Sequence, residues 1–155
     1  MYNHAPKDYV CPICVGIGRK ENDQTLISQS DIFYKDSFIT AFIGGRSWPN
    51  NPWGVIIVPN EHFENLYDIS EEVLSKVYLF AKKVAIALKE IYNCNGTSTR
   101  QHNEPAGNQD AWHFHVHVSP RYKDDKLYQL NDQKRWSEPE ERKPYADKLR
   151  EYFSK

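Results

Sequence analysis

Residues 112–118 read Trp-His-Phe-His-Val-His-Val, so apolar and histidine side chains alternate along this stretch. Successive side chains of a β-strand point to opposite faces of the sheet, and the alternation therefore predicts a strand that Pro120 closes. The apolar side chains share one face: Trp112, Phe114, Val116 and Val118. The other face carries His113, His115 and His117. One strand histidine is usually a plain polar residue, but three at alternate positions indicate a chemical site.

Three neighbouring imidazoles support two kinds of chemistry. They can bind one zinc ion, because hydrolytic zinc sites often combine histidine ligands with a water molecule. Alternatively, one neutral imidazole can attack phosphorus while its neighbours fix its tautomer. The zinc-hydrolase alternative lacks a carboxylate general base, because Asp110 is close in sequence and is expected on the other face.

The flanking chain predicts three further strand regions and a surface loop. Residues 31–42 are rich in aromatic and β-branched residues broken at 35–37, which is typical of a hairpin. The run Val-Ile-Ile-Val at 55–58, ended by a proline, predicts a central strand buried on both faces. Residues 97–101 predict another strand, and the Gly-, Pro- and Asn-rich segment 44–52 predicts a surface loop.

Two helices are expected. Ser70 is a good N-cap, and two glutamates follow it where the helix dipole favours negative charge. Apolar residues then recur at helical spacing: Val73, Val77, Ala81, Val84, Leu88 and Ile91. This helix should end near 93–96, where Asn and Gly favour a left-handed turn. A second helix is expected at 138–153, with an apolar stripe of Tyr145, Leu149 and Phe153.

Composition limits the function classes. With 155 residues, of which 39% are hydrophobic and 26% charged, the chain should form one soluble globular domain. Its formal charge of -1 argues against a nucleic-acid partner. The apolar runs are shorter than the roughly 20 residues of a membrane span, and the first residues have no signal-peptide core. We therefore expect no membrane association and a cytoplasmic location.

The cysteines point to metal or redox chemistry. Residues 11–14 read Cys-Pro-Ile-Cys, which suits a metal or redox pair better than a disulfide framework. A thioredoxin-like role is the weaker interpretation, because the pair does not lie between a strand and a long helix. Cys94 is interpreted as a small buried residue, and three cysteines in all fit a reducing compartment.

The stretch from Gln109 to Tyr122, Gln-Asp-Ala-Trp-His-Phe-His-Val-His-Val-Ser-Pro-Arg-Tyr, resembles the His-x-His-x-His signature of the histidine triad (HIT) nucleotide hydrolases and transferases. Further matches follow the family order at 11–14, 41–43, 55–62 and 66–69, so the resemblance covers about residues 9–122. It implies an α+β, HIT-like fold, with about five antiparallel strands and one long helix. It also implies a homodimer whose sheets join.

The resemblance also implies roles for individual residues. The middle histidine, His115, would attack the α-phosphorus of a nucleotide derivative and form a nucleotidyl-histidine, with His117 orienting it. Gln109 and Asn103 match residues that contact the phosphate. The nucleotide site would then contain His115, His117, Gln109 and Asn103, with an apolar wall for the base supplied by Phe42, Ile43 or Trp48.

In HIT proteins with a Cys-Pro-x-Cys motif, the resemblance implies a structural zinc site. The ligands would be Cys11, Cys14, His62 and His113, so His113 belongs to the triad and to the metal site. Two thiolates and two imidazoles satisfy a tetrahedral zinc, which would tie the N-terminus to the catalytic strand. A reduced Cys-x-x-Cys without metal is the alternative.

The domain division that follows is a HIT domain at 1–122 with an N-terminal zinc knuckle, and a C-terminal extension at 123–155. The extension is expected to pack on the same domain or at the dimer interface. Its mixed charges are typical of a solvated face. In the functional alternative, Arg135, Trp136 or Arg142 reaches across a dimer to touch substrate.

The chain departs from the family pattern at two loops. Gly44 and Gly45 stand where family members usually carry an acidic residue or Asn that binds the ribose, and the segment 106–109 is one residue longer than usual. We therefore expect a hydrolase or transferase that cleaves at the α-phosphate of a dinucleoside polyphosphate or a nucleotide phosphoramidate. The alternative is a catalytically weak nucleotide-binding protein with a structural zinc.

Overall fold

The computed structural model describes residues 2–18 and 22–155. Its main feature is a five-stranded antiparallel sheet in the order β1-β2-β4-β6-β5. The strands are β1 (Ile32–Lys35), β2 (Ile39–Ile43), β4 (Val55–Pro59), β5 (Gly96–Gln101) and β6 (Val116–Arg121). The predicted α+β class, the 31–42 hairpin, the central strand at 55–58 and the strand at 97–101 are all confirmed.

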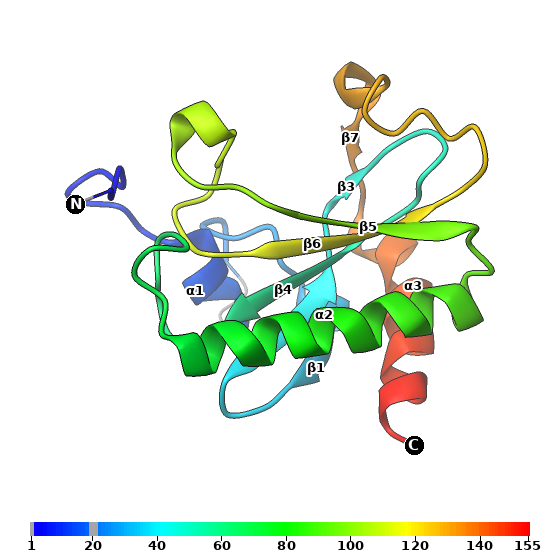
Figure 1. Ribbon diagram of the computed structural model, residues 1–155, viewed down its shortest axis with the longest axis horizontal. Coiled ribbons are helices and arrows are strands. Elements are labelled where there is room, and N and C mark those ends of the chain that lie inside the picture. The colour runs from blue at the N-terminus through cyan, green and yellow to red at the C-terminus, as the bar shows by residue number, and fades with distance from the viewer. Residues whose placement is uncertain (1, 19–21) are drawn as a thin grey trace.

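The long helix α2 (Glu71–Ile91) covers one face of the sheet (Figure 1). The Ser70 hydroxyl accepts a hydrogen bond from the Val73 N–H at 3.3 Å, as expected of an N-cap. Asn93 adopts the left-handed conformation, with φ of 51°, just beyond the helix. The apolar stripe predicted for α2 packs into the main core, so this helix is confirmed with its boundaries.

Strand β6 is shorter at its start than the sequence predicts. It begins at Val116, so His113 and His115 lie in the irregular segment just before it, and it continues through Pro120 to Arg121. The Phe114 N–H donates to the Phe63 carbonyl at 2.6 Å, and this contact with a loop replaces the pairing that would extend the strand. Alternation still places Phe114, Val116 and Val118 in the core beneath α2.

The opposite face of the sheet is partly covered by the N-terminal segment. The short helix α1 (Pro12–Ile17) begins at the Cys-x-x-Cys motif, with Cys11 as its N-cap. A second apolar cluster forms between α1 and the sheet, and it contains Cys11, Ile13, Ile17, Phe42 and Val58. The N-terminus is thereby held against the face that carries the histidines.

The segment 44–52 is more structured than a surface loop. Within it, β3 (Arg46–Ser47) pairs with β7 (Arg135–Trp136), a two-stranded sheet that the sequence does not reveal. A Cβ added at Gly45 would lie 2.7 Å from the Trp136 ring, so this contact requires glycine. Asn51 is buried and donates to the Pro120 carbonyl at 2.9 Å. The prediction that the whole segment lies on the surface is therefore wrong.

The C-terminal helix α3 (Pro139–Phe153) confirms the helix predicted at 138–153. Its residues Ala146 and Leu149 belong to the main core. Arg142 is 3% exposed and forms a bidentate ion pair with Asp31, with both nitrogen–oxygen distances at 2.8 Å. Arg142 therefore cannot reach across a dimer to a substrate, and that alternative is wrong for this residue.

Within the described part of the chain, no helix combines the length and the apolar character that crossing a membrane requires.

The buried pair between Arg142 and Asp31 attaches α3 to the rest of the fold. We predict that Arg142→Ala lowers the free energy of unfolding by about 3 to 5 kcal/mol, because it leaves a buried carboxylate without its partner. Urea denaturation measures the loss. Arg135→Ala removes an exposed ion pair with Glu141 and serves as the control, with a much smaller effect. Equal losses of unfolding free energy in the two variants would contradict a special contribution of the buried Arg142–Asp31 pair.

Candidate functional site

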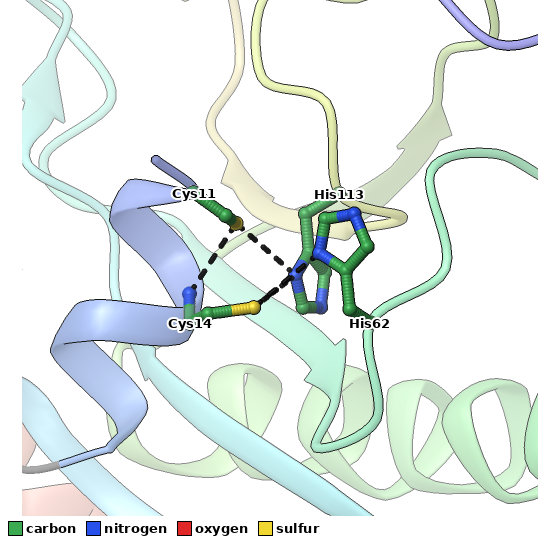
Figure 2. A group of neighbouring side chains, drawn as sticks. All are labelled: Cys11, Cys14, His62 and His113. Atoms are coloured by element: carbon green, nitrogen blue, oxygen red, sulfur yellow. Dashed lines mark hydrogen bonds between the residues drawn. The ribbon is translucent and has the colours of Figure 1, made fainter. Parts of the chain in front are cut away.

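Four potential metal ligands converge between α1 and the segment before β6. Figure 2 shows Cys11 and Cys14 from the N-terminal helix facing His62 and His113. The Cys14 sulfur lies 3.3 Å from Nδ1 of His62 and 3.4 Å from Nδ1 of His113. The Cys11 sulfur lies 3.4 Å from the same His113 nitrogen. All four ligand atoms lie within 4.8 Å of one another.

The geometry of this cluster fits a tetrahedral metal ion. Zinc–sulfur distances near 2.3 Å and zinc–nitrogen distances near 2.0 Å place neighbouring ligand atoms about 3.3 to 3.8 Å apart. The measured sulfur–nitrogen distances of 3.3 to 3.4 Å are close to this range. The residues form a potential metal site of two sulfur and two nitrogen donors.

Protonation in the cluster also suits a metal. His113 Nε2 lies 3.0 Å from the Pro59 carbonyl, which can only accept, so Nε2 carries the proton and Nδ1 keeps its lone pair for a metal. Burial lowers the pKa of His113 to about 4, which keeps the ring neutral. Burial and the adjacent Cys11 raise the pKa of Cys14 to about 12, so this thiol ionises near neutral pH only beside a cation.

His115 is held in one tautomer. Its Nδ1 lies 2.7 Å from the backbone carbonyl of His113, and because a carbonyl only accepts, Nδ1 carries the proton. The lone pair is then on Nε2. Burial lowers the pKa of His115, whose side chain is 5% exposed, and this favours the neutral, nucleophilic ring. His113 thus contacts His115 through its backbone, while its own ring faces the sulfurs.

His117 lies at the centre of a row of side chains that crosses the sheet. Strand register pairs Phe42 with Ile56, Ile56 with His117, and His117 with Arg100. Directly paired residues point to the same face, so this row runs from apolar to charged. The rings of His115 and His117 lie 5.0 Å apart. Burial, and to a smaller degree the electrostatic interaction with His115 and Arg100, holds the pKa of His117 well below its usual value.

Gln109 and Asn103 lie in the loops near the triad, where their side chains contact the backbone. The Gln109 amide donates to the Glu64 carbonyl at 2.6 Å and to the Ala111 carbonyl at 3.0 Å. Its oxygen accepts from the Glu104 N–H at 2.8 Å. The Asn103 oxygen accepts from the Leu66 N–H at 2.8 Å. Both side chains therefore fix the loops around the triad.

Two of the three residues proposed for the base wall, Phe42 and Ile43, lie on opposite faces of β2. Phe42 shares the face of His117 but is covered by α1 and 3% exposed. Ile43 points into the main core beneath α2, as alternation along a strand requires. The structure therefore does not bring Ile43 to the triad. The half-buried Ile56, which lies directly beside His117, takes the place expected for an apolar contact.

Sequence reasoning missed several residues near the triad. Arg100 pairs directly with His117, and Arg46 forms an ion pair at 3.0 Å with Asp110. His102 donates through Nδ1 to the Gly107 carbonyl at 2.7 Å, and it is a minor cause, after burial, of the lowered pKa of both His115 and His117. The register of β5 and β6 places Arg100 beside His117, and no local motif in the sequence marks any of the three residues.

The comparisons with known proteins identify the class. The family model of the HIT domain matches residues 26–124, and the chain therefore belongs to the HIT domain family. The match begins after α1, so Cys11 and Cys14 lie outside the matched region.

Individual relatives show the same family. The chain is 26% identical to "Protein hit" of Bacillus subtilis, over 57% of this chain and 60% of that protein's length. It is 30% identical to the bis(5'-adenosyl)-triphosphatase of Dictyostelium discoideum, over 70% of each. A Zn-bound histidine triad family protein from Mycobacterium smegmatis has a TM-score of 0.72 at 20% identity, with 93% of both chains covered. This last likeness establishes the fold alone.

Proposed function

We propose that the protein is a nucleotide hydrolase or transferase that cleaves at the α-phosphate of a dinucleoside polyphosphate or a nucleotide phosphoramidate. The observation that carries the proposal is the hydrogen bond of 2.7 Å between His115 Nδ1 and the His113 carbonyl. It leaves the His115 Nε2 lone pair available to attack phosphorus. The HIT relatives include a bis(5'-adenosyl)-triphosphatase, which supports a nucleotide substrate.

The proposed reaction has two displacements. In the first, the Nε2 lone pair of His115 forms a bond to the α-phosphorus while the bond to the leaving group breaks, and the leaving group takes that electron pair. An amine leaving group also takes up a proton from solvent and departs neutral. The ring becomes positively charged, and the His113 carbonyl stabilises the proton on Nδ1. In the second, water or another acceptor forms a bond to phosphorus and releases its proton to solvent, while the P–N bond breaks and its electron pair returns to Nε2.

Neighbouring residues position the reacting groups in this proposal. His117 orients His115 from 5.0 Å away and lies beside the nucleotide. Gln109 and Asn103 hold the phosphate-side loops, and Phe42 supports the apolar end of the row that carries Ile56. His113 contributes its carbonyl to the reaction and its ring to the metal site.

The metal in this proposal is a structural zinc bound by Cys11, Cys14, His62 and His113. Two thiolates and two imidazoles leave no open coordination position for catalysis. The zinc would supply folding free energy by joining α1 to the segment that carries the triad. Its removal would loosen that segment and so act on His115 indirectly.

A nucleotide-binding protein with weak turnover is the second candidate. It is favoured by Gly44 and Gly45, which offer no side chain to the ribose hydroxyls, and by the Trp136 ring that packs on Gly45. We further propose a homodimer joined through sheet edges, which are β1 and β5 here. A cytoplasmic location fits the three free cysteines.

We predict that His115→Ala lowers kcat for mononucleotide release by at least about 1000-fold, because the variant has no nucleophile. The measurement is AMP formation from diadenosine triphosphate and from adenosine 5'-phosphoramidate. His4→Ala, which removes a histidine outside the triad and the metal site, is the control. Retained turnover in His115→Ala would exclude the covalent route, and nucleotide binding without turnover in the unaltered protein would favour the second candidate.

We predict one zinc ion per purified chain, measured by elemental analysis. Cys14→Ser should lose the metal, whereas Cys94→Ser should keep it, because Cys94 is buried away from the cluster in the main core. Metal loss should lower the midpoint of thermal unfolding by at least about 5 °C, the shift that a loss of roughly 2 kcal/mol causes in a domain of this size. Equal zinc content in the two variants would rule out this ligand set.

A further inference from the structure

Two arginines lie over the ring of Tyr128 on the triad face of the sheet. The guanidinium carbons of Arg121 and Arg100 are 4.9 Å and 5.4 Å from the ring centre. Arg121 is neutralised by Asp125 through two hydrogen bonds, at 2.7 Å and 2.8 Å, and it also donates to Ser98. Its hydrogen-bonding capacity is used within the fold.

Arg100 differs from Arg121 in having no counterion. Across residues 2–18 and 22–155, no carboxylate forms an ion pair with it. Its Nε is buried and has no hydrogen-bond partner within the described residues. Trp48 is also close to the guanidinium, 5.9 Å from its carbon to the ring centre. Aromatic rings near a guanidinium hold the cation in place but leave its donors unsatisfied.

The position of Arg100 places its unpaired positive charge close to the proposed reaction centre. It is the direct cross-strand partner of His117, on the same face of the sheet. Burial is the main cause of the lowered pKa of His117, and the charge of Arg100 contributes to it. His117 is in turn next to the proposed nucleophile, with rings 5.0 Å apart. An anion bound by Arg100 would therefore lie beside the reacting phosphorus.

We infer that Arg100 binds the negatively charged leaving group and sets a preference for nucleotides linked to a phosphate chain over nucleotides linked to an amine. This inference rests on the proposed function. A guanidinium donates several hydrogen bonds in one plane and matches phosphate oxygens well. The guanidinium charge does not stabilise a neutral amine leaving group. A nucleoside diphosphate leaving group is negatively charged, and the guanidinium stabilises it.

The surroundings of Arg100 also suit the rest of a nucleotide leaving group. Trp48 lines a hollow of about 300 Å³ together with Ser47, Pro49, Gln133 and Arg135. An aromatic wall next to a cation is the usual arrangement for a base and its phosphates. Gln133 and Arg135 of this lining belong to the C-terminal extension beyond residue 122. In this inference the extension therefore contributes to substrate specificity.

The experiment compares two substrates that release the same nucleotide. Diadenosine triphosphate has an anionic leaving group, and adenosine 5'-phosphoramidate has a neutral one. For Arg100→Gln, kcat/KM for the triphosphate should fall about 10- to 100-fold, the loss expected when charge-assisted hydrogen bonds to phosphate are removed. The phosphoramidate value should stay largely unchanged, and Arg100→Lys should recover part of the loss.

A charge-matched control is Lys82→Gln, which removes a positive charge from the exposed side of α2 on the opposite face of the sheet. It should leave both substrates unaffected. If Arg100→Gln reduces kcat/KM equally for both substrates, or for neither, the inference is overturned while the proposed function stands. Thermal unfolding of each variant shows whether the fold is kept.

Binding of inorganic triphosphate, measured by calorimetry, separates this inference from the proposed function. Arg100→Gln should bind it about 10-fold more weakly than Lys82→Gln does. If the unaltered protein cleaves neither substrate, the proposed function fails, and this binding comparison alone decides the role of Arg100. Equal affinities in the two variants would overturn the inference.

Discussion

The pairing of β6 with β4 on one side and β5 on the other is the constraint on which the rest of the structure depends. It buries Val116 and Val118 beneath α2 and fixes which side chains remain on the opposite face. There the register places His117 between Ile56 and Arg100. A slip by one residue would turn His117 into the core, so packing under α2 and the chemistry of the other face are specified by the same hydrogen bonds.

His113 connects the two parts of the candidate site. Its Nε2 contacts the Pro59 carbonyl and its Nδ1 contacts the sulfurs of Cys11 and Cys14. Its backbone carbonyl accepts a hydrogen bond from Nδ1 of His115. The cluster of four potential metal ligands therefore includes the residue that fixes the tautomer of His115. This explains in physical terms why an N-terminal Cys-x-x-Cys and a distant triad occur together, since one residue belongs to both sites.

Local signals in the sequence predicted the five strands of the main sheet and the two long helices. The resemblance to the HIT family, and no local signal, implied the full set of four potential metal ligands. Because successive side chains of a strand point to opposite faces, Phe42 and Ile43 cannot both face the triad. This rule would have excluded Ile43 from the base wall. The pairing of β3 with β7 could not be predicted, because two-residue strands carry no periodicity. Arg100 was missed for a related reason, since its place beside His117 follows from strand register, which depends on the whole sheet.

The central claim is that His115 forms a covalent bond to the nucleotide. The most direct measurement is peptide mapping by mass spectrometry after the enzyme is mixed with diadenosine triphosphate and quenched in alkali, which preserves a histidine–phosphorus bond. The account predicts one adenylyl group on the peptide that contains residues 112–118, localised to His115 by fragmentation and absent in His115→Ala. An adenylyl group on another residue, or rapid AMP release with no adduct at any time point, would contradict it.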